Sequence, residues 1–572
     1  MKQTSQTDTL RIDSIQVNSL GGKIGMTLCP GKQVISSVSG EWARDLDADL
    51  AVIGEWGATA LLSLIEPHEF ENLGVARMKQ GLPAGITHYI LPIVDGAVPS
   101  GTWERAWANI GPQVRERLAL GERIVIHCRG GLGRTGMVAA RLLVEFGEVP
   151  ATAMRRVRAA RPGAIENRRQ EEYVLRQKPL ESILPRPQYP VDPLLLSRYR
   201  GCLLGGAVGD ALGAPVEFMD VTAILKQFGA AGIRDFVPYA NKLGAITDDT
   251  QMTLFTAEGL LRSANRARLS GGDPDFQTGV AQAYQRWLVT QGDKSRLTPD
   301  VQSGWLIRHG PLFARRAPGI TCLTTLCKMV RHDEQARNDS KGCGGVMRMA
   351  PVGLFVSGKE EAATDHAQTA FDLGCQLAGI THGHPAGQHA AGVLAVLIVR
   401  VIQGASLPAA LDEARTILKT RNDHEETLAA INLAVRLVED SGDCDNHLRQ
   451  LGQGWVAEEA LAIAIYCALR SNSFEEGVRL AVNLTGDSDS TGAIAGNLLG
   501  ALYGVEAIPP RWLEPLELRE VITAVADDLL SWPQWTIGDR RPDDPARLGE
   551  WAYWVDRYPG NLVGGFRRNP ER

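Results

Sequence analysis

Five prolines lie between Lys178 and Pro193 and divide this chain of 572 residues into two parts of different pattern. Proline donates no backbone hydrogen bond, and it restricts its own φ and the conformation of the residue before it. Neither a helix nor a central strand can continue through such a segment, so a short semi-rigid linker is predicted. We expect one domain at residues 1–178, a linker at 179–196, and a second domain with a C-terminal extension at 197–572.

The two parts differ in the spacing of their apolar residues. Before the linker, the runs at 61–65 and 124–126 are typical of buried strands, and 103–118 and 136–146 have helical spacing. This alternation predicts an α/β layered domain. After the linker the strand signals largely vanish, and segments rich in Ala, Leu and Gly predict one large all-α domain. The segments with helical spacing are 199–209, 251–264, 386–403, 428–438, 458–469 and 492–503.

Composition is ordinary for a soluble globular protein and argues against several other classes. The net charge of -6 gives no general electrostatic footprint for nucleic acid. Nine cysteines, an odd number without regular spacing, do not form a disulfide framework. The polar N-terminus does not resemble a signal peptide, and we expect no apolar stretch of membrane-spanning length. A cytoplasmic protein without a membrane partner is therefore expected.

A Cys-x5-Arg loop between a β-branched run and a helix is the main feature of the first part. Gly130, Gly131 and Gly133 allow successive backbone N–H groups to turn inward around an anion. The N-terminus of the following helix favours the same anion and lowers the pKa of the Cys128 thiol. Arg134 adds a bidentate fork for two phosphate oxygens. The spacing favours a site for phosphate ester hydrolysis over a merely buried cysteine.

Two more residues suit the same chemistry. Asp95 follows a strand-like run and is a candidate general acid for the departing oxygen, although an aspartate in a turn is also common. Gln170 is a candidate to orient the hydrolytic water, although a glutamine on a surface helix needs no such role. Thr135 is placed to donate a hydrogen bond to the sulfur when it leaves, and Cys29 is expected to be structural.

The first part resembles the protein tyrosine and dual-specificity phosphatases, and especially the kinase-associated phosphatases, over residues 15–178. The resemblance rests on an Asp-Gly acid loop, on His-Cys-x-Gly-Gly-Leu-Gly-Arg, and on Arg-Pro-Gly-Ala-Ile-Glu. It implies an α/β cysteine-phosphatase fold, a phosphoprotein substrate, Cys128 as nucleophile, Arg134 as phosphate clamp and Asp95 as acid. The implied phosphate-binding residues are Arg129, Gly130, Gly131, Leu132, Gly133 and Arg134.

Acidic residues far apart in the second part suggest a metal centre. Hard ions such as Mg²⁺ prefer carboxylate and hydroxyl oxygens. Neighbouring carboxylates on a helix diverge by about 100°, so two ions fit a pair at a helix start better than one. The oxygen-bearing side chains that could close a binuclear site are Thr247, a potential helix N-cap, with Asp248, Asp249, Asp487, Asp489 and Ser490.

The second part resembles the ADP-ribosylglycohydrolases from residue 197 to about residue 530. The matching segments are 201–213, 217, 247–250, 342–348, 381–382 and 486–492. The resemblance implies an all-α fold and two Mg²⁺ ions, with Mn²⁺ as a possible substitute, held by the six residues named above. The form Asp-Ser-Asp-Ser at 487–490 is similar to that of arginine-specific hydrolases and favours ADP-ribosyl-arginine as the substrate.

The same resemblance implies the residues that contact ADP-ribose. Glycines in the segment 342–345 can bring backbone N–H groups close to a diphosphate. Glu217 is a candidate acid/base or gate, and His382 a candidate phosphate or ribose contact. The implied ADP-ribose-binding residues are Gly342, Gly344, Gly345, Val346, Met347, Arg348 and His382. We expect Gly205, Gly206 and Gly209 to pack helices, and His384 to be structural.

The main hypothesis is a bifunctional hydrolase that removes phosphate from a phosphoprotein and ADP-ribose from a modified protein or conjugate. One alternative makes one domain a binding module, which would have no use for a full set of catalytic residues and metal ligands. Another is an immunity or defence factor that reverses the action of an ADP-ribosylating toxin. The sequence leaves the linkage open between arginine, serine and small-molecule conjugates.

Overall fold

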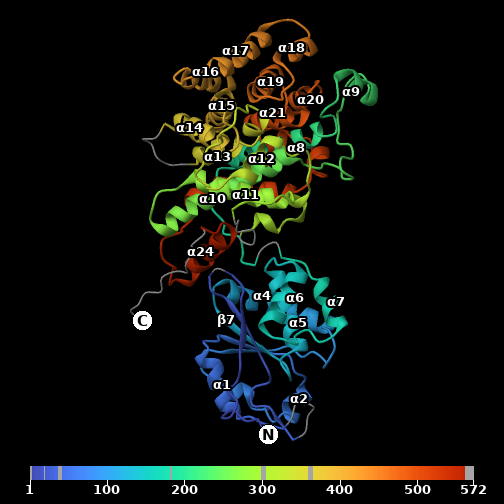
Figure 1. The fold of residues 1–572 in the computed structure, drawn as a ribbon, viewed down its shortest axis with the longest axis vertical. Helices are drawn as coiled ribbons and strands as arrows, with labels where there is room; N and C mark the ends of the chain where they lie inside the picture. Colours follow the sequence, from blue (N-terminus) through green and yellow to red (C-terminus); the bar gives the residue numbers. More distant parts are fainter. Residues whose placement is uncertain are drawn as a thin grey trace. The chain divides into compact units, whose positions relative to one another are not determined.

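The structure is a computed structural model, and it describes residues 3–18, 20–35, 41–180, 183–297, 304–358 and 365–560. The chain divides into two compact units. One includes Met1–Pro187 and Arg540–Asp556, and the other includes Gln188–Asp539 and Arg557–Asn561. The first is an α/β unit and the second is helical (Figure 1), which confirms the predicted fold class.

A five-stranded sheet with the order β1-β2-β7-β5-β6 forms the centre of the first unit. β1 is antiparallel to β2, whereas β2, β7, β5 and β6 are parallel to their neighbours. The strands are β1 Asp13–Gln16, β2 Lys23–Thr27, β5 Ala60–Ser63, β6 Thr87–Ile90 and β7 Arg123–His127, with β3 Gln33–Val34 and β4 Trp42–Ala43 in a separate pair. The strands predicted at 61–65 and 124–126 correspond to β5 and β7.

Helices cover both faces of the sheet because alternate residues of the strands point to opposite sides. Ile124 and Ile126 of β7 belong to one apolar cluster with α4–α7, and Val125 belongs to another with α1 and α3. The helices are α1 Leu46–Glu55, α2 Pro67–Asn72, α3 Met78–Gly81, α4 Gly101–Ala119, α5 Gly133–Glu145, α6 Pro150–Ala160 and α7 Arg168–Leu175. This layering brings the carboxyl end of β7 to the N-terminus of α5.

The second unit is built from helices joined by connections of varied length, some of which contain 3₁₀ turns. The helices before residue 400 are α8 Pro193–Gly213, α9 Val221–Phe228, α10 Asp248–Ser270, α11 Phe276–Thr290, α12 Ile320–Lys328, α13 Ala350–Ser357, α14 His366–Ala378 and α15 Pro385–Ile402. Those that follow are α16 Leu407–Leu418, α17 Glu425–Glu439, α18 Cys444–Leu451, α19 Ala457–Arg470, α20 Phe474–Val482, α21 Ser488–Tyr503, α22 Pro510–Leu513 and α23 Arg519–Ser531. The last helix, α24 Pro545–Arg557, belongs to the first unit as far as Asp556.

Glycines allow α8 and α21 to pack backbone against backbone. A Cβ atom added at Gly205 would lie 2.4 Å from the carbonyl oxygen of Gly496, and one at Gly209 would lie 1.9 Å from that of Gly492. The same close approach joins Gly201 to Gly500 at one end of the helix pair. Gly205 and Gly209 therefore pack helices, as predicted. The antiparallel contact brings the C-terminal end of α8 beside the N-terminal end of α21.

The helix α15 departs from the expectation that no segment is apolar enough to cross a membrane. By length and composition alone it passes that test, with a mean hydropathy of 1.5. However, 78% of the apolar window is buried inside the structure. Its neighbours include α13 and α14, whose side chains replace water around it. The apolar composition therefore has an explanation as the core of a helical unit.

We predict that Gly496→Ala destabilises the helical unit by about 1–3 kcal/mol, because the new methyl group overlaps the backbone of α8. Thermal unfolding would measure the loss. Gly272→Ala is the matched control, since the nearest atom to its added Cβ is 3.6 Å away and its φ is not positive. Equal melting temperatures for the Gly496 variant and the native chain would contradict the close-packing argument.

Candidate active sites

The Cys128 loop lies between the carboxyl end of β7 and the start of α5 at Gly133. The thiol is buried, and the backbone N–H of Gly131 donates a hydrogen bond to Sγ over 3.2 Å. Gly131 has φ of 71°, and a Cβ there would lie 2.2 Å from the carbonyl oxygen of Thr27. Only glycine fits this turn. The loop and the helix N-terminus together form a cradle for an anion.

Arg134 is buried in the first turn of α5 and is held by an acid that the sequence reasoning did not include. Its Nη1 and Nη2 donate to the two carboxylate oxygens of Glu69 over 2.6 and 3.0 Å. Nη1 also donates to the carbonyl oxygen of Ile93 over 2.9 Å. Burial alone would raise the pKa of Glu69, but the hydrogen bonds from Arg134 outweigh it and hold this pKa below its usual range. Glu69 therefore fixes the direction of the guanidinium group.

Asp95, the predicted general acid, lies at the same arginine. Its Oδ1 is 2.9 Å from Nη2 of Arg134, and its side chain is 61% exposed. The structure thus brings the predicted acid and the predicted phosphate clamp together at the edge of the loop.

Gln170, at the start of α7, is buried next to the loop rather than on a free surface. Its Oε1 accepts a hydrogen bond from the backbone N–H of Glu166 over 2.9 Å. Its Nε2 is buried with no hydrogen-bond partner among the described residues, as is Oγ1 of Thr135. A Cβ at Gly133 would lie 2.9 Å from that Nε2. Two unpartnered polar groups beside the loop are suited to a bound oxygen ligand.

Arg161 also supports the loop, and sequence reasoning gave it no role. Its Nε donates to the carbonyl oxygen of Gly131 over 2.5 Å, and its Nη1 lies 2.7 Å from Oδ2 of Asp13. These contacts hold the carbonyl group of Gly131 on the outer side of the loop, so the backbone N–H groups occupy the inner side.

Cys29 is buried, and burial raises the pKa of its thiol, which agrees with the structural role expected of it.

The acidic residues of the second unit meet where α8, α10 and α21 come together. Thr247 is the N-cap of α10, as predicted, and its Oγ1 accepts from the N–H of Asp249 over 3.3 Å. The N–H of Ser490 donates to Oδ1 of Asp489 over 2.9 Å and to Oδ1 of Asp487 over 3.3 Å. Helix N-termini stabilise these carboxylates, so the local sequence places anions where backbone dipoles favour them.

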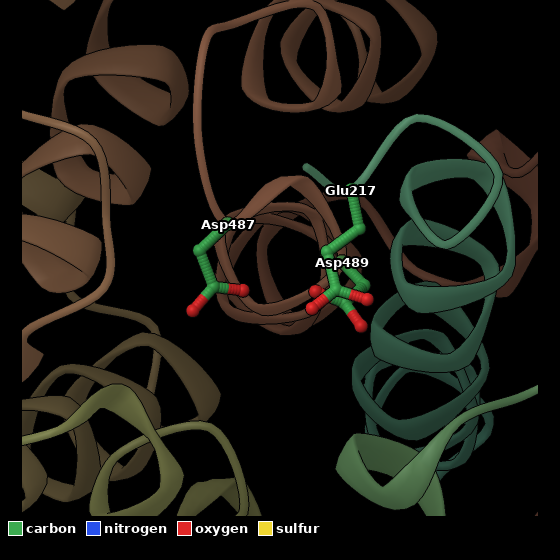
Figure 2. A group of neighbouring side chains, drawn as sticks. All are labelled: Glu217, Asp487 and Asp489. Carbon is green, nitrogen blue, oxygen red and sulfur yellow. The ribbon is translucent and has the colours of Figure 1, made fainter. Parts of the chain in front are cut away.

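Three of these carboxyl groups form one cluster (Figure 2). One carboxylate oxygen from each of Glu217, Asp487 and Asp489 lies within 4.8 Å of the others. Burial, Asp489 and other neighbouring carboxylates raise the pKa of Glu217 to about 10. Among the residues that the structure describes, none of these three forms an ion pair with a lysine, arginine or histidine. In the described part of the chain, no basic side chain therefore balances the negative charge of this cluster.

Asp210 on α8 is a further buried acid, and it ties the helices of the cluster together. Its carboxylate accepts from the backbone N–H groups of Thr247 and Thr250, each over 3.1 Å, and from Oγ1 of Thr250 over 2.5 Å. Burial and the repulsion from Asp489 raise the pKa of Asp210 to about 7. Asp210 lies in the segment 201–213, which resembles the glycohydrolases. Its distance in sequence from the other acids did not mark it as a site residue, because only the α8–α21 contact brings it near them.

The remaining predicted ligands border the same cluster. Asp248 accepts from the N–H of Gly319 over 3.2 Å, while Oδ2 of Asp249 is buried and has no hydrogen-bond partner in the described part of the chain. Cys343 donates from Sγ to Oδ2 of Asp487 over 2.7 Å, and Ser490 Oγ lies 3.6 Å from that sulfur. Burial and the charges of Asp487 and Asp249 raise the pKa of the Cys343 thiol.

The glycine segment 342–345 lies against His382. A Cβ at Gly344 would be 3.3 Å from Cε1 of the ring. His382 is buried, and its Nδ1 is 2.8 Å from Oγ1 of Thr381. Burial and the nearby Arg348 lower the pKa of His382 to about 3, so the ring is neutral near pH 7. His384 caps α15 by accepting from the N–H of Ala386, in agreement with its expected structural role.

Val346, Met347 and Arg348 turn into the interior behind that segment. Val346 and Met347 are buried apolar residues. The guanidinium group of Arg348 lies 4.3 Å from the centre of the Tyr284 ring and donates to Oγ1 of Thr381 over 2.5 Å. Since Arg348 is fully buried, its direct partners are these interior groups. Arg348 donates to the same Thr381 hydroxyl that contacts His382, so it helps to hold the His382 ring in place.

An exposed aromatic pair lies next to the acidic cluster and was not expected from the sequence. Phe218 follows Glu217, has φ of 67°, and its side chain is 74% exposed. Its ring stacks on Trp455 with centroids 5.2 Å apart. Trp455 accepts at its carbonyl oxygen from the N–H of Cys343 and also lines a cavity of about 670 Å³ with Glu459. The left-handed backbone of a non-glycine residue costs of order 1–3 kcal/mol. At Phe218 this conformation is combined with an exposed ring, which forms a flat apolar surface.

Comparisons with known proteins agree with the assignment of both domains. The family model described as ADP-ribosylglycohydrolase matches residues 192–536, and a model described as "Polymorphic toxin system, DSP-PTPase phosphatase" matches residues 41–148. Both domains therefore belong to classes of hydrolase. The chain belongs to the ADP-ribosylglycohydrolase family and carries an N-terminal phosphatase-like domain, which confirms both resemblances seen in the sequence.

Individual relatives each cover part of this chain. An uncharacterized protein of Archaeoglobus fulgidus is 30% identical over 58% of this chain and 95% of its own length. The ADP-ribosylarginine hydrolase Tri1 of Pseudomonas putida is 27% identical over 58% of this chain and 78% of its own. A solved kinase-associated phosphatase with its catalytic cysteine changed to serine is 23% identical, covers 29% of this chain and 93% of its own, and has a TM-score of 0.26.

We predict that Glu69→Gln lowers kcat/KM for p-nitrophenyl phosphate by roughly 10- to 100-fold, because a misdirected guanidinium group no longer matches the phosphate oxygens. Affinity for inorganic phosphate should weaken in parallel, which a merely structural role would not require. Glu71→Gln on the exposed side of the same helix is the control. Unchanged phosphate affinity in the Glu69 variant would rule out its positioning role.

Proposed function

We propose that this bifunctional hydrolase releases ADP-ribose from arginine side chains of modified proteins with the aid of two Mg²⁺ ions, and removes phosphate from phosphoproteins through Cys128. The observation that carries the first activity is the buried acidic cluster, in which no ion pair joins the described acids to a basic side chain. The second rests on the Cys128 loop and its buried arginine. We place both activities in the cytoplasm, where a nucleophilic thiol stays reduced.

The donor set suits hard divalent ions. Buried carboxylates without a positive partner cost several kcal/mol each, and the unpartnered Oδ2 of Asp249 needs a ligand. Six residues would hold the ions, with Mn²⁺ as a substitute for Mg²⁺: Thr247, Asp248, Asp249, Asp487, Asp489 and Ser490. When bound, such ions position the ribose hydroxyls and lower the pKa of a water molecule.

The protein's own groups have separate tasks in the cleavage of the N-glycosidic bond. Water adds to the anomeric carbon of ribose as the bond to the guanidine nitrogen breaks, and a proton must reach that nitrogen. Glu217 is the group that we assign to this proton transfer, since a carboxylate oxygen of Glu217 lies within 4.8 Å of carboxylate oxygens of Asp487 and Asp489, two of the proposed ligands. The N–H groups of 342–345 and the neutral ring of His382 would bind the diphosphate and ribose.

In the phosphatase domain the steps involve only protein groups. The Cys128 thiolate attacks phosphorus, the P–O bond to the leaving group breaks, and Asp95 donates a proton to that oxygen. Arg134 and the loop N–H groups neutralise the equatorial phosphate oxygens. Water, oriented by Gln170, then attacks phosphorus and gives a proton to the Asp95 carboxylate. The S–P bond breaks, and phosphate and the Cys128 thiolate are released. Release of Arg134 from Asp95 by the incoming phosphate would free the acid for its role.

Two observations support arginine as the acceptor. The relative from Pseudomonas putida is named an ADP-ribosylarginine hydrolase. The Phe218–Trp455 pair next to Glu217 offers an aromatic face, and Glu459 is among the residues that line the cavity beside Trp455. A planar guanidinium group stacks on aromatic rings and pairs with carboxylates, whereas a serine side chain does neither.

A role in toxin defence is a second candidate function. The model that matches residues 41–148 carries "Polymorphic toxin system" in its description. Expression of the chain beside an ADP-ribosylating toxin would test this role, since only a defence factor active on the toxin's target restores growth. A protein that leaves the toxin fully lethal would confine the function to endogenous substrates.

We predict that Cys128→Ser reduces hydrolysis of p-nitrophenyl phosphate to background but leaves ADP-ribose release intact. A serine hydroxyl keeps the size of the thiol but does not ionise near neutral pH. Cys29→Ser, at the other buried cysteine near this loop, is the matched control and should keep phosphatase activity. A serine variant at position 128 with native turnover would remove Cys128 as the nucleophile.

A second series tests the metal ligands. Ser490→Thr should keep ADP-ribose release, Ser490→Ala should raise the Mg²⁺ concentration for half-activation roughly 10-fold, and Asp487→Asn roughly 100-fold, since the last removes an anionic oxygen. Initial rates against Mg²⁺ concentration would measure these shifts, with phosphatase activity as the internal control. Activity that survives complete chelation would contradict metal dependence.

Substrate linkage has its own test. Trp455→Ala should raise KM for ADP-ribosyl-arginine peptides roughly 5-fold or more, because a cation–π contact is lost. KM for an ADP-ribosyl-serine peptide of the same sequence should change less, if that peptide is cleaved at all. Equal effects on both peptides would show that Trp455 does not distinguish arginine from serine as the modified residue. Faster cleavage of the serine peptide by the native chain would overturn the assignment of arginine as the acceptor.

A further inference from the structure

Three polar side chains lie together in an otherwise apolar layer next to the Cys128 loop. They come from neighbouring strands of the sheet, Ser63 from β5, His88 from β6 and His127 from β7. Ser63 is paired in register with His127, and both face the same side of the sheet as Val125, which packs in an apolar cluster. Ser63 and His127 are fully buried. Buried polar groups of this kind are normally hydrogen-bonded, here to one another.

One hydroxyl group joins the two histidine rings. Oγ of Ser63 lies 2.7 Å from Nε2 of His88 and 2.6 Å from Nε2 of His127. On the other side of the His127 ring, Nδ1 lies 3.3 Å from the carbonyl oxygen of Cys128. The three side chains thus form a continuous hydrogen-bond chain that ends on the backbone of the proposed nucleophile.

The donors and acceptors of this chain determine where each proton lies. The carbonyl oxygen of Cys128 can only accept, so Nδ1 of His127 carries a proton. Burial lowers the pKa of His127 to about 3, and the neutral ring therefore has no proton on Nε2 near pH 7. This Nε2 must accept from the Ser63 hydroxyl, whose oxygen in turn accepts from the Nε2–H of His88. Burial also lowers the pKa of His88 to about 4, so that ring is neutral as well.

The carbonyl group of Cys128 is linked directly to the phosphate cradle. It shares one planar trans peptide unit with the N–H of Arg129, so the two groups point in opposite directions. In the described part of the chain, the N–H of Arg129 donates no hydrogen bond, while its carbonyl oxygen accepts from the N–H of Cys29 over 3.4 Å. By holding the Cys128 carbonyl, His127 therefore leaves the N–H of Arg129 to an anion in the loop.

We propose that Ser63 and His88 are positioning residues of the phosphatase site. They fix the proton of His127 on Nδ1 and so keep the N–H of Arg129 directed at the bound phosphate. Without the hydroxyl donor, the proton can move to Nε2, and the bare Nδ1 then repels the Cys128 carbonyl oxygen. The peptide unit turns, and the phosphate loses one donor. The inference rests on the proposed phosphatase function and adds residues of two further strands to that site.

Pairs of variants in the full chain test the two positions. Ser63→Ala removes the hydroxyl, whereas Ser63→Thr retains it. His88→Leu removes the ring N–H, whereas His88→Gln retains an N–H at about the position of Nε2. Ser14→Ala, at an exposed serine of β1, is the matched control. Affinity for inorganic phosphate is measured by titration calorimetry, and kcat/KM is measured with p-nitrophenyl phosphate.

We expect Ser63→Ala and His88→Leu each to weaken phosphate binding and to lower kcat/KM by roughly 10-fold, because one cradle donor is misdirected. Ser63→Thr and His88→Gln should stay within about 3-fold of the native chain, since the donors are kept. Native phosphate affinity in Ser63→Ala would overturn the inference. Equal losses in His88→Leu and His88→Gln would do the same, because they would show that only the packing of His88 matters.

Nitrogen NMR of the chain with isotopically labelled histidine rings gives a second measurement, which needs no variant at Ser63 or His88. The resonances of His127 are those that disappear in His127→Asn, whose amide keeps an N–H at the position of Nδ1. The inference predicts a protonated Nδ1 and an unprotonated Nε2 for His127 in the native chain. The opposite arrangement, with the proton on Nε2, would overturn it.

The same experiments separate this inference from the proposed function. A native chain that binds inorganic phosphate but does not hydrolyse p-nitrophenyl phosphate would reject the phosphatase activity, while the phosphate affinities of the variants would still decide the role of Ser63 and His88. Hydrolysis that requires Cys128, with unchanged phosphate affinity in Ser63→Ala and His88→Leu, would reject the positioning role alone.

Discussion

Repulsion between buried carboxylates is the constraint on which the helical unit depends. Asp210, Glu217, Asp248, Asp487 and Asp489 are forced toward one another, and burial raises the pKa of each. Repulsion from neighbouring carboxylates raises it further for all of them except Asp489. Side-chain packing alone would not bring them together, because water solvates separated charges better. The backbone contact of α8 and α21 overrides this preference, since its glycines let two helices approach too closely for the acids to separate. Bound cations would remove the conflict.

The phosphatase-like unit meets the opposite electrostatic problem. There the loop N–H groups, the start of α5 and the buried Arg134 concentrate positive potential around Cys128. Glu69 and Asp95 partly neutralise it. The positive potential of the first site favours an anion, and the acidic cluster of the second favours cations. Each site thus has a charge opposite to that of its proposed ligand. Glu69 stays as a fixed support, whereas the exposed Asp95 is free to change partners.

Much of this organisation could be predicted from local sequence, but the supporting residues could not. The Cys128 loop, the N-cap at Thr247 and the packing role of Gly205 and Gly209 follow from residue types at short spacing. Glu69 lies far from Arg134 in the sequence, and its carboxylate is recognisable only once α2 and α5 are placed around the sheet. Residues such as Asp210, Cys343 and Phe218 reach the acidic cluster through helix packing and a left-handed backbone, which no local pattern encodes. The apolar composition of α15 likewise has meaning only once its neighbours are known.

The central claim is that the junction of α8, α10 and α21 is a two-cation site. Anomalous diffraction from crystals of the chain grown with Mn²⁺ tests it most directly. The account predicts two manganese peaks between the first turns of α10 and α21, with carboxylate oxygens of Asp248, Asp249, Asp487 and Asp489 as ligands. No peak at this junction, or manganese bound only elsewhere in the chain, would contradict it.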